Sequence, residues 1–134
     1  MNEVLEFLTT TPTFYLATID GDQARVRPFG AVMKYEDKLY FATNNTKSVF
    51  KQLVANPKVE ISTTSTKGEW IRLSGNAVVD SSREAKAAML EAAPMLKSMY
   101  SLNDSVCEVF YLTDAVAVFN SFSNPTPKTI QLYD

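Results

Sequence analysis

The sequence contains no histidine, and this absence excludes more chemistry than any other property of the chain. Without imidazole there is no serine–histidine or cysteine–histidine catalytic pair, no histidine metal ligand and no histidine proton shuttle. The single cysteine, Cys107, can form neither an intrachain disulfide nor a cysteine-rich zinc site. We therefore expect no resident metal ion, and we interpret Cys107 as a buried, unreactive thiol.

Long hydrophobic runs are also lacking. No apolar stretch approaches the roughly 20 residues that a membrane-spanning helix needs, and the N-terminus lacks the charged and then apolar pattern of a secretory signal. These features predict a soluble, cytoplasmic protein without a membrane partner. The 134 residues, 46% hydrophobic and 21% charged, predict one globular domain over residues 1–134.

The formal charge of −2 hides an uneven distribution. The segment from Gln23 to Lys58 holds seven basic and two acidic residues, a local charge of +5, which leaves −7 for the rest of the chain. Such a basic segment suits a small anionic ligand better than nucleic acid, which usually selects a face that is basic throughout. A solvated basic surface without a ligand is the alternative interpretation.

Apolar and β-branched segments separated by turn residues predict a chain made mainly of strands. About seven strands are expected, at residues 13–19, 23–35, 38–43, 58–64, 69–80, 106–113 and 115–122. Three short helices are expected: one capped by Asn2 and ending before Pro12, one opened by residues 44–46 and ending at 56–57, and one opened by a capping box at Ser81 and Glu84. A further helical turn is expected over residues 95–100.

Several breaks in these patterns shape the predicted fold. Pro28 and Gly30 predict an edge position or a bulge in the second strand, Gly75 predicts a bend in the fifth, and Asp114 is expected to turn a closing hairpin. The tail from residue 124 shows little periodicity. Strands and helices do not alternate, so the predicted fold class is mainly β, with an antiparallel sheet curled into a small β-barrel and short helices packed outside.

Two arginines mark the first candidate binding site. Arg25 and Arg27 lie two residues apart on a predicted strand, which puts their side chains on one face, roughly 7 Å apart. Paired guanidinium groups are suited to phosphate because each offers several donors in one plane. An exposed pair of surface arginines is the alternative.

The start of the second predicted helix is the next candidate. Its free backbone N–H groups and its positive dipole end favour an anion. Thr43, Thr46 and Ser48 can donate hydroxyl bonds there, and Lys47 and Lys51 supply positive charge from one helical face. An ordinary helix cap beside solvated lysines would produce the same pattern.

The only tryptophan, Trp70, shares a predicted strand face with Arg72 and Ser74. A tryptophan on such a polar-lined face can stack on a flat ligand, although a lone tryptophan more often belongs to a core or an interface. No pair of carboxylates has a spacing that indicates acid–base catalysis.

The order of four segments carries more information than any one of them. They run over residues 23–29, 39–48, 53–59 and 70–77. In this order and spacing, the chain resembles the pyridoxamine 5′-phosphate oxidase-like family of FMN-binding split-barrel proteins over nearly its whole length. The resemblance implies a homodimeric antiparallel split β-barrel with FMN in each of two clefts between the subunits. Strands that are apolar on both faces, as at Tyr111 and Leu112, independently favour a homodimer.

The resemblance also implies which residues contact FMN. The strand matching residues 25–29 runs along the flavin ring, the segment matching residues 43–48 closes around the phosphate, and the position matching Trp70 approaches the ring. The candidate cofactor-binding residues are therefore Arg25, Val26, Arg27, Pro28, Phe29, Ala42, Thr43, Asn44, Lys47, Ser48, Lys51 and Trp70. No catalytic residue is assigned. The C-terminal features that hold the vitamin in true pyridoxamine phosphate oxidases are missing, which disfavours vitamin B6 oxidation.

A bound flavin removes the difficulty that the lack of histidine creates, because the flavin supplies the redox chemistry. The leading hypothesis is an FMN-dependent oxidoreductase or flavin reductase acting on an unidentified small molecule, with NADH or NADPH as the candidate donor. The alternatives are an FMN-binding or stress-related protein without turnover and a flavin-free barrel that binds oligonucleotides. Haem degradation is disfavoured because no histidine can serve as an axial ligand.

Overall fold

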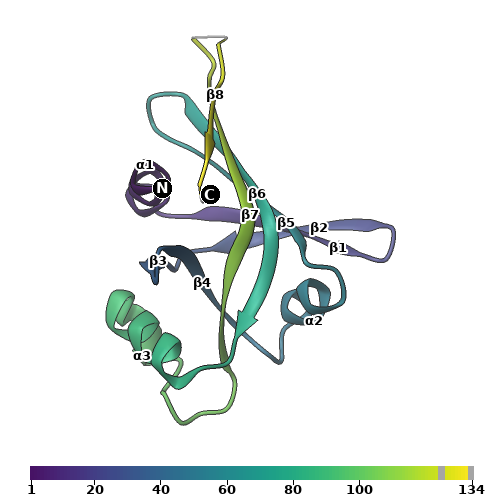
Figure 1. The fold of residues 1–134 in the computed structure, drawn as a ribbon, viewed down its shortest axis with the longest axis vertical. Helices are drawn as coiled ribbons and strands as arrows, with labels where there is room; N and C mark the ends of the chain where they lie inside the picture. The colour runs from purple at the N-terminus through teal and green to yellow at the C-terminus, as the bar shows by residue number, and fades with distance from the viewer. Residues whose placement is uncertain (124–125, 133–134) are drawn as a thin grey trace.

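The computed structural model describes residues 1–123 and 126–132, which form eight strands, three α-helices and one 3-10 helix (Figure 1). The strands are β1 (Phe14–Asp20), β2 (Gln23–Phe29), β3 (Val32–Tyr35), β4 (Lys38–Asn44), β5 (Lys58–Thr64), β6 (Glu69–Asp80), β7 (Cys107–Ser121) and β8 (Lys128–Gln131). The helices are α1 (Asn2–Thr10), α2 (Ser48–Ala55), α3 (Arg83–Ala92) and the 3-10 helix η1 (Pro94–Ser98). All strand pairs are antiparallel, so the mainly β prediction is confirmed.

The sheet closes on itself because a short link joins its two edges. The strand order is β2-β1-β5-β6-β7-β4-β3, with β8 paired to β7 outside this path. Only Gly30 and Ala31 separate β2 from β3. In a flat sheet these edges would lie roughly 29 Å apart, whereas two linking residues span at most about 11 Å. The sheet therefore curls into a barrel that is split between β2 and β3.

The long antiparallel pair of β6 and β7 runs down most of the molecule in Figure 1. The predicted hairpin turn at Asp114 is wrong, because β7 continues unbroken along β6 from Cys107 to Ser121. A bulge takes the place of the turn: the register shifts at Gly75, and Asp114 adopts a φ of 52°. A Cβ on Gly75 would lie 3.0 Å from the carbonyl oxygen of Thr113, so this close approach of the two strands favours glycine.

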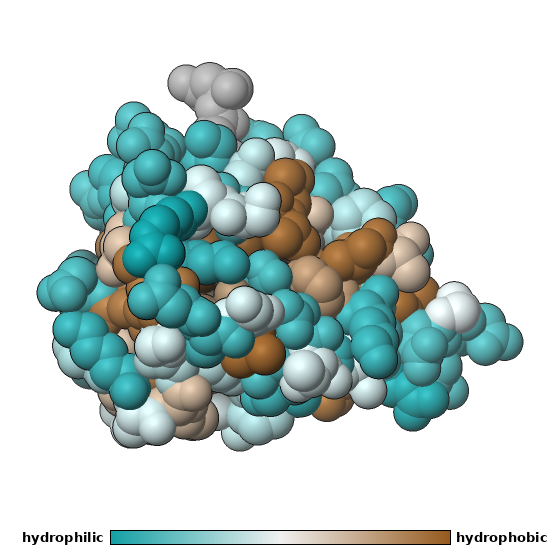
Figure 2. Space-filling model, turned by 90° about the horizontal axis from the view of Figure 1, so that it is seen from below, coloured by the Kyte–Doolittle hydropathy of each residue, from teal (hydrophilic) through white to brown (hydrophobic). Residues whose placement is uncertain are grey.

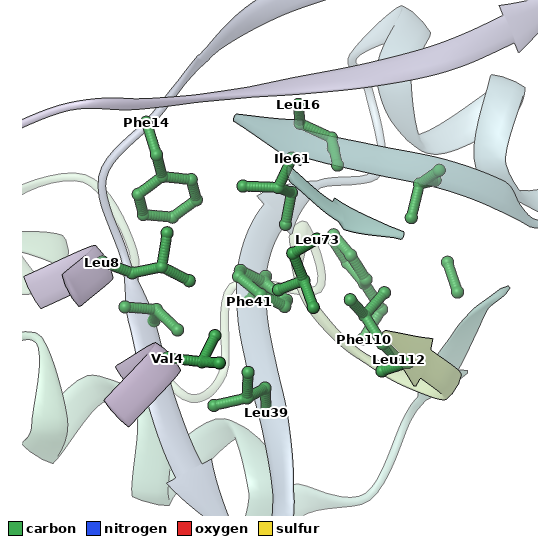
Figure 3. Close-up of a cluster of buried hydrophobic side chains, with 14 of the residues drawn as sticks. Val4, Leu8, Phe14, Leu16, Leu39, Phe41, Ile61, Leu73, Phe110 and Leu112 are labelled. Atoms are coloured by element: carbon green, nitrogen blue, oxygen red, sulfur yellow. The ribbon is translucent and has the colours of Figure 1, made fainter. Parts of the chain in front are cut away.

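The main hydrophobic core fills the barrel, and it holds the inward side chains of β1, β3, β4, β5, β6 and β7. Phe41 lies at its centre, with its ring centroid 5.8 Å from that of Phe14 and 5.5 Å from that of Phe110. Figure 3 shows Val4 and Leu8 of α1 pointing into the same cluster. The apolar face expected for the first helix therefore closes the barrel.

A second hydrophobic cluster lies outside the barrel, beneath α3 and η1. Its buried members are Ala31, Met33, Tyr40, Ala85, Met89, Leu90, Ala93, Leu96 and Val109. β4 serves both clusters because its side chains alternate between the two faces of the sheet, with Phe41 inside the barrel and Tyr40 outside. This outer cluster fixes the position of η1.

Several element ends differ from the predictions. Asn2 begins α1 instead of capping it, and Ser82 caps α3 in place of Ser81, by accepting a hydrogen bond of 3.2 Å from the N–H of Ala85. The second predicted strand is divided into β2, which does lie at a sheet edge, and β3. Part of the tail forms β8, whereas residues 124–125 and 133–134 lie outside the described residues.

Among the helices of the described residues, none is both long enough and apolar enough to span a membrane.

Candidate functional site

A cleft of about 220 Å³ brings together the two segments in which most of the candidate site residues lie. β2 contributes Pro28 and Phe29, β4 contributes Ala42 and Thr43, and Lys47 comes from the position just before α2. The two strands are far apart in the sheet order, and the curl of the barrel brings them to one cleft. Five of the twelve candidate residues therefore line a single space.

Thr43 provides the test of whether this cleft suits a polar ligand. Its side chain is 5% exposed, and its Oγ1 atom has no hydrogen-bond partner among the described residues. A buried hydroxyl without a partner costs about 1–3 kcal/mol. Thr43 also lines the cleft, and a ligand whose polar atom reaches this hydroxyl would supply the missing bond, so the residues present fit a group such as FMN.

Arg27 is held in place by neutral partners. Its Nη1 donates to Thr18 Oγ1 at 2.7 Å and to the carbonyl oxygen of Leu16 at 3.2 Å, and its Nη2 donates to Gln52 Oε1 at 2.7 Å. Burial and, to a smaller extent, the nearby Arg25 lower the pKa of Arg27. No carboxylate forms an ion pair with Arg27 within the described residues. Its positive charge therefore remains available to an anion.

The other β2 candidates differ from Arg27. The Nε atom of Arg25 forms an ion pair of 3.2 Å with Asp20, and both side chains are about half exposed. Val26 alternates to the outer face of the sheet, where 67% of its surface is exposed. Arg25 and Arg27 share a face as predicted, but Asp20 already offsets part of the charge of Arg25.

The chain before α2 is shaped by a turn. Asn44 Oδ1 accepts hydrogen bonds from the N–H of Thr46 at 2.8 Å and from its hydroxyl at 2.6 Å. These bonds delay the helix, which begins at Ser48, with Lys47 in the capping position and no side chain capping it. The exposed side chains of Lys47, Ser48 and Lys51 lie at or near this helix start. The local chemistry suits an anion.

Trp70 does not join the cleft of its own chain. It lies at the start of β6, with its ring centroid 6.3 Å from that of Phe122 and 5.1 Å from the guanidinium carbon of Arg72. The shared face with Arg72 is as predicted. Within one chain, the structure therefore separates Trp70 from Lys47 and Thr43.

The sequence patterns did not predict two parts of the site. Gln52 joins Arg27 and Thr18, because its Oε1 accepts from both, the second at 2.6 Å. Gln52 lies one turn into the second predicted helix, close to the expected anion site, and this position could have indicated that it belongs to the site. The cleft wall opposite the strands consists of Met95, Leu96, Met99 and Tyr100. The helical turn predicted over residues 95–100 is present in part as η1, but no role was assigned to it.

Two other features of the molecule, a cysteine and a second hollow, are less suited to FMN binding or chemistry than the cleft. Cys107 is 2% exposed, which confirms that the thiol is buried, and burial raises its pKa, which disfavours the reactive thiolate. A wider hollow of about 610 Å³ lies beside Tyr40, Asp80 and Tyr111. Several of its groups already have partners, since Tyr40 donates to Asp80 Oδ2 at 2.8 Å and Lys38 lies over the ring of Tyr111.

A curled antiparallel sheet that is open between β2 and β3 and carries an anion-suited cleft at this opening defines a split-barrel protein. The sequence profile of the pyridoxamine 5′-phosphate oxidase family matches residues 1–109. The chain belongs to this family, as the resemblance indicated.

Solved structures agree with this assignment. A NimC/NimA family protein from Clostridium acetobutylicum is 52% identical, with a TM-score of 0.93 over 96% of this chain and 90% of that one. A pyridoxamine 5′-phosphate oxidase-related, FMN-binding protein from Nostoc punctiforme is 15% identical, with a TM-score of 0.67 over 96% and 82% of the two chains. No curated protein sequence matches the chain.

The fold alone does not determine the ligand. A heme binding protein from Mycobacterium smegmatis is 16% identical to this chain, with a TM-score of 0.72 over 94% of this chain and 56% of that one. Structures of the same fold thus include one described as binding FMN and one described as binding heme. The choice between ligands has to come from the side chains of the cleft.

Proposed function

We propose that the chain binds FMN at the cleft and acts as an FMN-dependent oxidoreductase or flavin reductase on a small molecule, with NADH or NADPH as the donor. The observation that carries this proposal is the buried, unpartnered hydroxyl of Thr43, a residue that lines the cleft together with Lys47. The FMN-binding relative from Nostoc punctiforme supports the same ligand. The sequence offers no histidine to serve as an axial ligand for heme.

The residues around the cleft divide into two groups by their chemistry. Lys47, Ser48 and the uncapped start of α2 would hold the phosphate, with the charge of Arg27 nearby. Pro28 and Phe29 offer the apolar side along which the flavin ring would lie. When bound, FMN supplies the redox chemistry. The side chains of the protein bind it, orient it and shield it from water.

The size of the cleft supports a homodimer. At about 220 Å³, the cleft is smaller than the roughly 300 Å³ at the lower end of small-molecule sites, so one chain does not enclose FMN. The outer face of the sheet exposes 48% of Tyr15 and 67% of Val26. A second copy packed on this face would cover these groups and complete the cleft.

The visible spectrum of the purified protein tests the cofactor directly. A flavin spectrum, with the released compound identified as FMN by mass, is expected, and a colourless protein that takes up no added FMN would contradict the proposal. Anaerobic bleaching by NADH or NADPH is expected of an oxidoreductase. FMN binding without bleaching would support the alternative of a non-catalytic FMN-binding protein.

Titrations with FMN and riboflavin test the phosphate site. A charge-assisted hydrogen bond contributes about 1.5–3 kcal/mol, so Lys47→Ala should weaken FMN at least tenfold and leave the weaker riboflavin binding unchanged. Lys67→Ala, in the turn before β6, is the matched control because Lys67 does not line the cleft. Equal affinity of the wild type for FMN and riboflavin would remove the phosphate assignment.

The dimer is tested by light scattering and by mixing variants. A stable monomer near 14.9 kDa would contradict the shared site. We propose that Trp70 of one chain approaches the flavin whose phosphate lies near Arg27 and Lys47 of the other. If Arg27→Ala and Trp70→Asp each abolish FMN binding, a mixed dimer of the two variants should recover one of its two sites. No recovery would mean that Trp70 does not act across the interface.

A further inference from the structure

The wider hollow beside Tyr40 combines aromatic rings with charged side chains. The face of the molecule in Figure 2 carries several hydrophobic patches between hydrophilic side chains, which is common on protein surfaces. The hollow, of about 610 Å³, is different, because three tyrosines, three carboxylates and one lysine are among the residues that line it. Small-molecule sites have volumes of roughly 300–1,000 Å³. The hollow is therefore large enough for a ligand, and its lining indicates which kind.

The tyrosine rings of the hollow stand at an angle to one another. The ring centroids of Tyr35 and Tyr40 lie 5.3 Å apart with the rings at 83°, and those of Tyr40 and Tyr111 lie 5.2 Å apart with the rings at 44°. Tyr40 is 3% exposed and is fixed by its hydrogen bond to Asp80, so it braces the partly exposed rings of Tyr35 and Tyr111. Aromatic rings that surround one space are suited to binding an ammonium group.

One ring of the hollow already holds a cation. The Nζ atom of Lys38 lies 5.1 Å from the centroid of the Tyr111 ring. An ammonium group within about 6 Å of a ring centroid is attracted by the negative charge density of the ring face. Within the described residues, Lys38 forms no ion pair with a carboxylate, and no cation lies over the ring of Tyr35. The hollow thus accepts an ammonium group at one ring and leaves a second ring open.

The charge of the hollow favours a cation over an anion. Glu36, Asp80 and Glu84 supply three negative charges and Lys38 supplies one positive charge, a local charge of −2. None of the three carboxylates forms an ion pair within the described residues. The same part of the chain contains no group of three or more acidic or cysteine side chains that could hold a metal ion. The rings and the separated carboxylates together suit an organic cation better than a metal ion.

We propose that this hollow is a second binding site of the protein and that it takes a small organic cation, a protonated or quaternary amine. The cationic group lies against the rings of Tyr35 and Tyr111, and the carboxylates of Glu36 and Glu84 attract it. Lys38 competes with the ligand for the ring of Tyr111. The site does not depend on FMN, because the hollow and the cleft share no lining residue.

Three probes of similar shape and different charge test the preference for a cation. Tetramethylammonium is cationic, tert-butanol is uncharged and pivalate is anionic at neutral pH. Each is titrated into the isotope-labelled, purified protein at low salt, and binding is followed by the shifts of the amide NMR signals of residues 35–40 and 111. One exposed contact between a cation and an aromatic ring raises the affinity about two- to fivefold.

Two rings and a negative local charge should therefore make tetramethylammonium bind at least tenfold more tightly than tert-butanol, with pivalate the weakest of the three. Equal affinity for the cation and the alcohol would overturn the inference. Signals of residues 35–40 and 111 that do not move with tetramethylammonium would overturn it as well.

Variants of Tyr35 test the open ring. Tyr35→Leu should weaken tetramethylammonium about two- to fivefold, because the leucine side chain has no aromatic face. Tyr35→Phe keeps the ring and should retain the wild-type affinity. Unchanged binding in Tyr35→Leu, or an equal loss in both variants, would mean that the ring does not contact the cation.

Removal of the built-in cation tests the hollow without weakening the fold. Lys38→Met frees the ring of Tyr111 and should strengthen tetramethylammonium binding at least threefold. Lys34→Met is the matched control, because it removes the same charge from the same hairpin of β3 and β4, although Lys34 does not line the hollow. No gain in Lys38→Met would overturn the inference. An equal gain in both variants would also overturn it, since net charge alone would then explain the binding.

Discussion

The cluster inside the barrel and the cluster beneath α3 differ in what borders them. The buried members of the inner cluster are all apolar, and α1 and α2 close its ends. The outer cluster includes Tyr40 and is bordered by Tyr35, Tyr100 and Tyr111. It opens into the candidate cleft at one end and into the wider hollow near Asp80 at the other. From this comparison we expect that the barrel interior supplies most of the stability, whereas the layer outside it borders the candidate ligand cleft.

Truncation at the centre of the inner cluster should have the largest effect on stability. Phe41 is fully buried between Phe14 and Phe110, with little room for the barrel to collapse around a cavity. Phe41→Ala should lower the free energy of unfolding by about 3–5 kcal/mol, measured by chemical denaturation. A loss below 1 kcal/mol would mean that the inner cluster is not the main source of stability.

Truncation of a side chain in the outer cluster should lower the free energy of unfolding by less. Leu96 is 7% exposed and lies at the margin of its cluster, where neighbouring side chains can close over a gap. Leu96→Ala should lower the free energy of unfolding by about 2 kcal/mol, the lower end of the range for buried leucines. A loss as large as that of Phe41→Ala would remove the distinction between the clusters.

The hydrogen bond between Tyr40 and Asp80, at the border of the outer cluster, should stabilise the fold to an extent that depends on pH. Burial raises the pKa of Asp80, but hydrogen bonds from Ser82 and from the Tyr40 hydroxyl outweigh burial and hold the pKa below its usual value. A lowered carboxyl pKa stabilises the fold above the unfolded pKa of about 3.9, and this stabilisation is lost as the pH falls through the folded pKa. Tyr40→Phe should therefore cost about 1.5 kcal/mol at pH 7 and clearly less near pH 2.

Denaturation of wild type and variant at the two pH values measures this difference. Tyr35→Phe is the matched control, because no hydrogen bond from the Tyr35 hydroxyl is present among the described residues, although its ring also packs on Tyr40. A cost of Tyr40→Phe that does not change with pH would mean that the bond to Asp80 does not stabilise the charged carboxylate.

The smallest expected effect is at the start of α3. Ser82→Ala removes the side-chain cap and should cost about 1 kcal/mol, whereas Ser81→Ala should cost almost nothing. Thermal unfolding of the two variants compares adjacent serines in the same loop. Equal losses would indicate that the cap is shared between them.

These adjacent serines illustrate why sequence patterns locate elements better than their ends. The bounds predicted for residues 58–64 and 69–80 are correct because alternation and turn residues delimit them on both sides. Ser81 followed by Glu84 matches a capping box, but Asp80 Oδ1 accepts a hydrogen bond from the N–H of Ser82 and shifts the cap by one residue. The predicted turn at Asp114 fails because a bulge and a turn both place a polar residue at a positive φ.

The candidate site was predicted only in part, because sequence patterns report local structure and not which distant segments meet. Lys47 and Thr43 lie in a segment with local signals, namely a strand end followed by a helix start. Their convergence with Pro28 depends on the curl of the barrel, which no local pattern encodes. Met95 and Met99 carry no local signal as residues that line the cleft, because their place depends on how Leu96 anchors the segment between them. The roles assigned to the twelve candidate residues stay predictions.

The unbroken strand β7 separates the parts of the sheet that can open locally from those that open only when the whole fold unfolds. β6 covers one edge of β7 along nearly its whole length, while β4 and then β8 cover the other edge, at residues 107–111 and 116–119. A backbone amide enclosed on both sides exchanges its hydrogen with solvent only when the neighbouring strands separate. The slowest-exchanging amides of β7 should therefore report global unfolding, and those of β2, at a free edge, should report local opening beside the cleft.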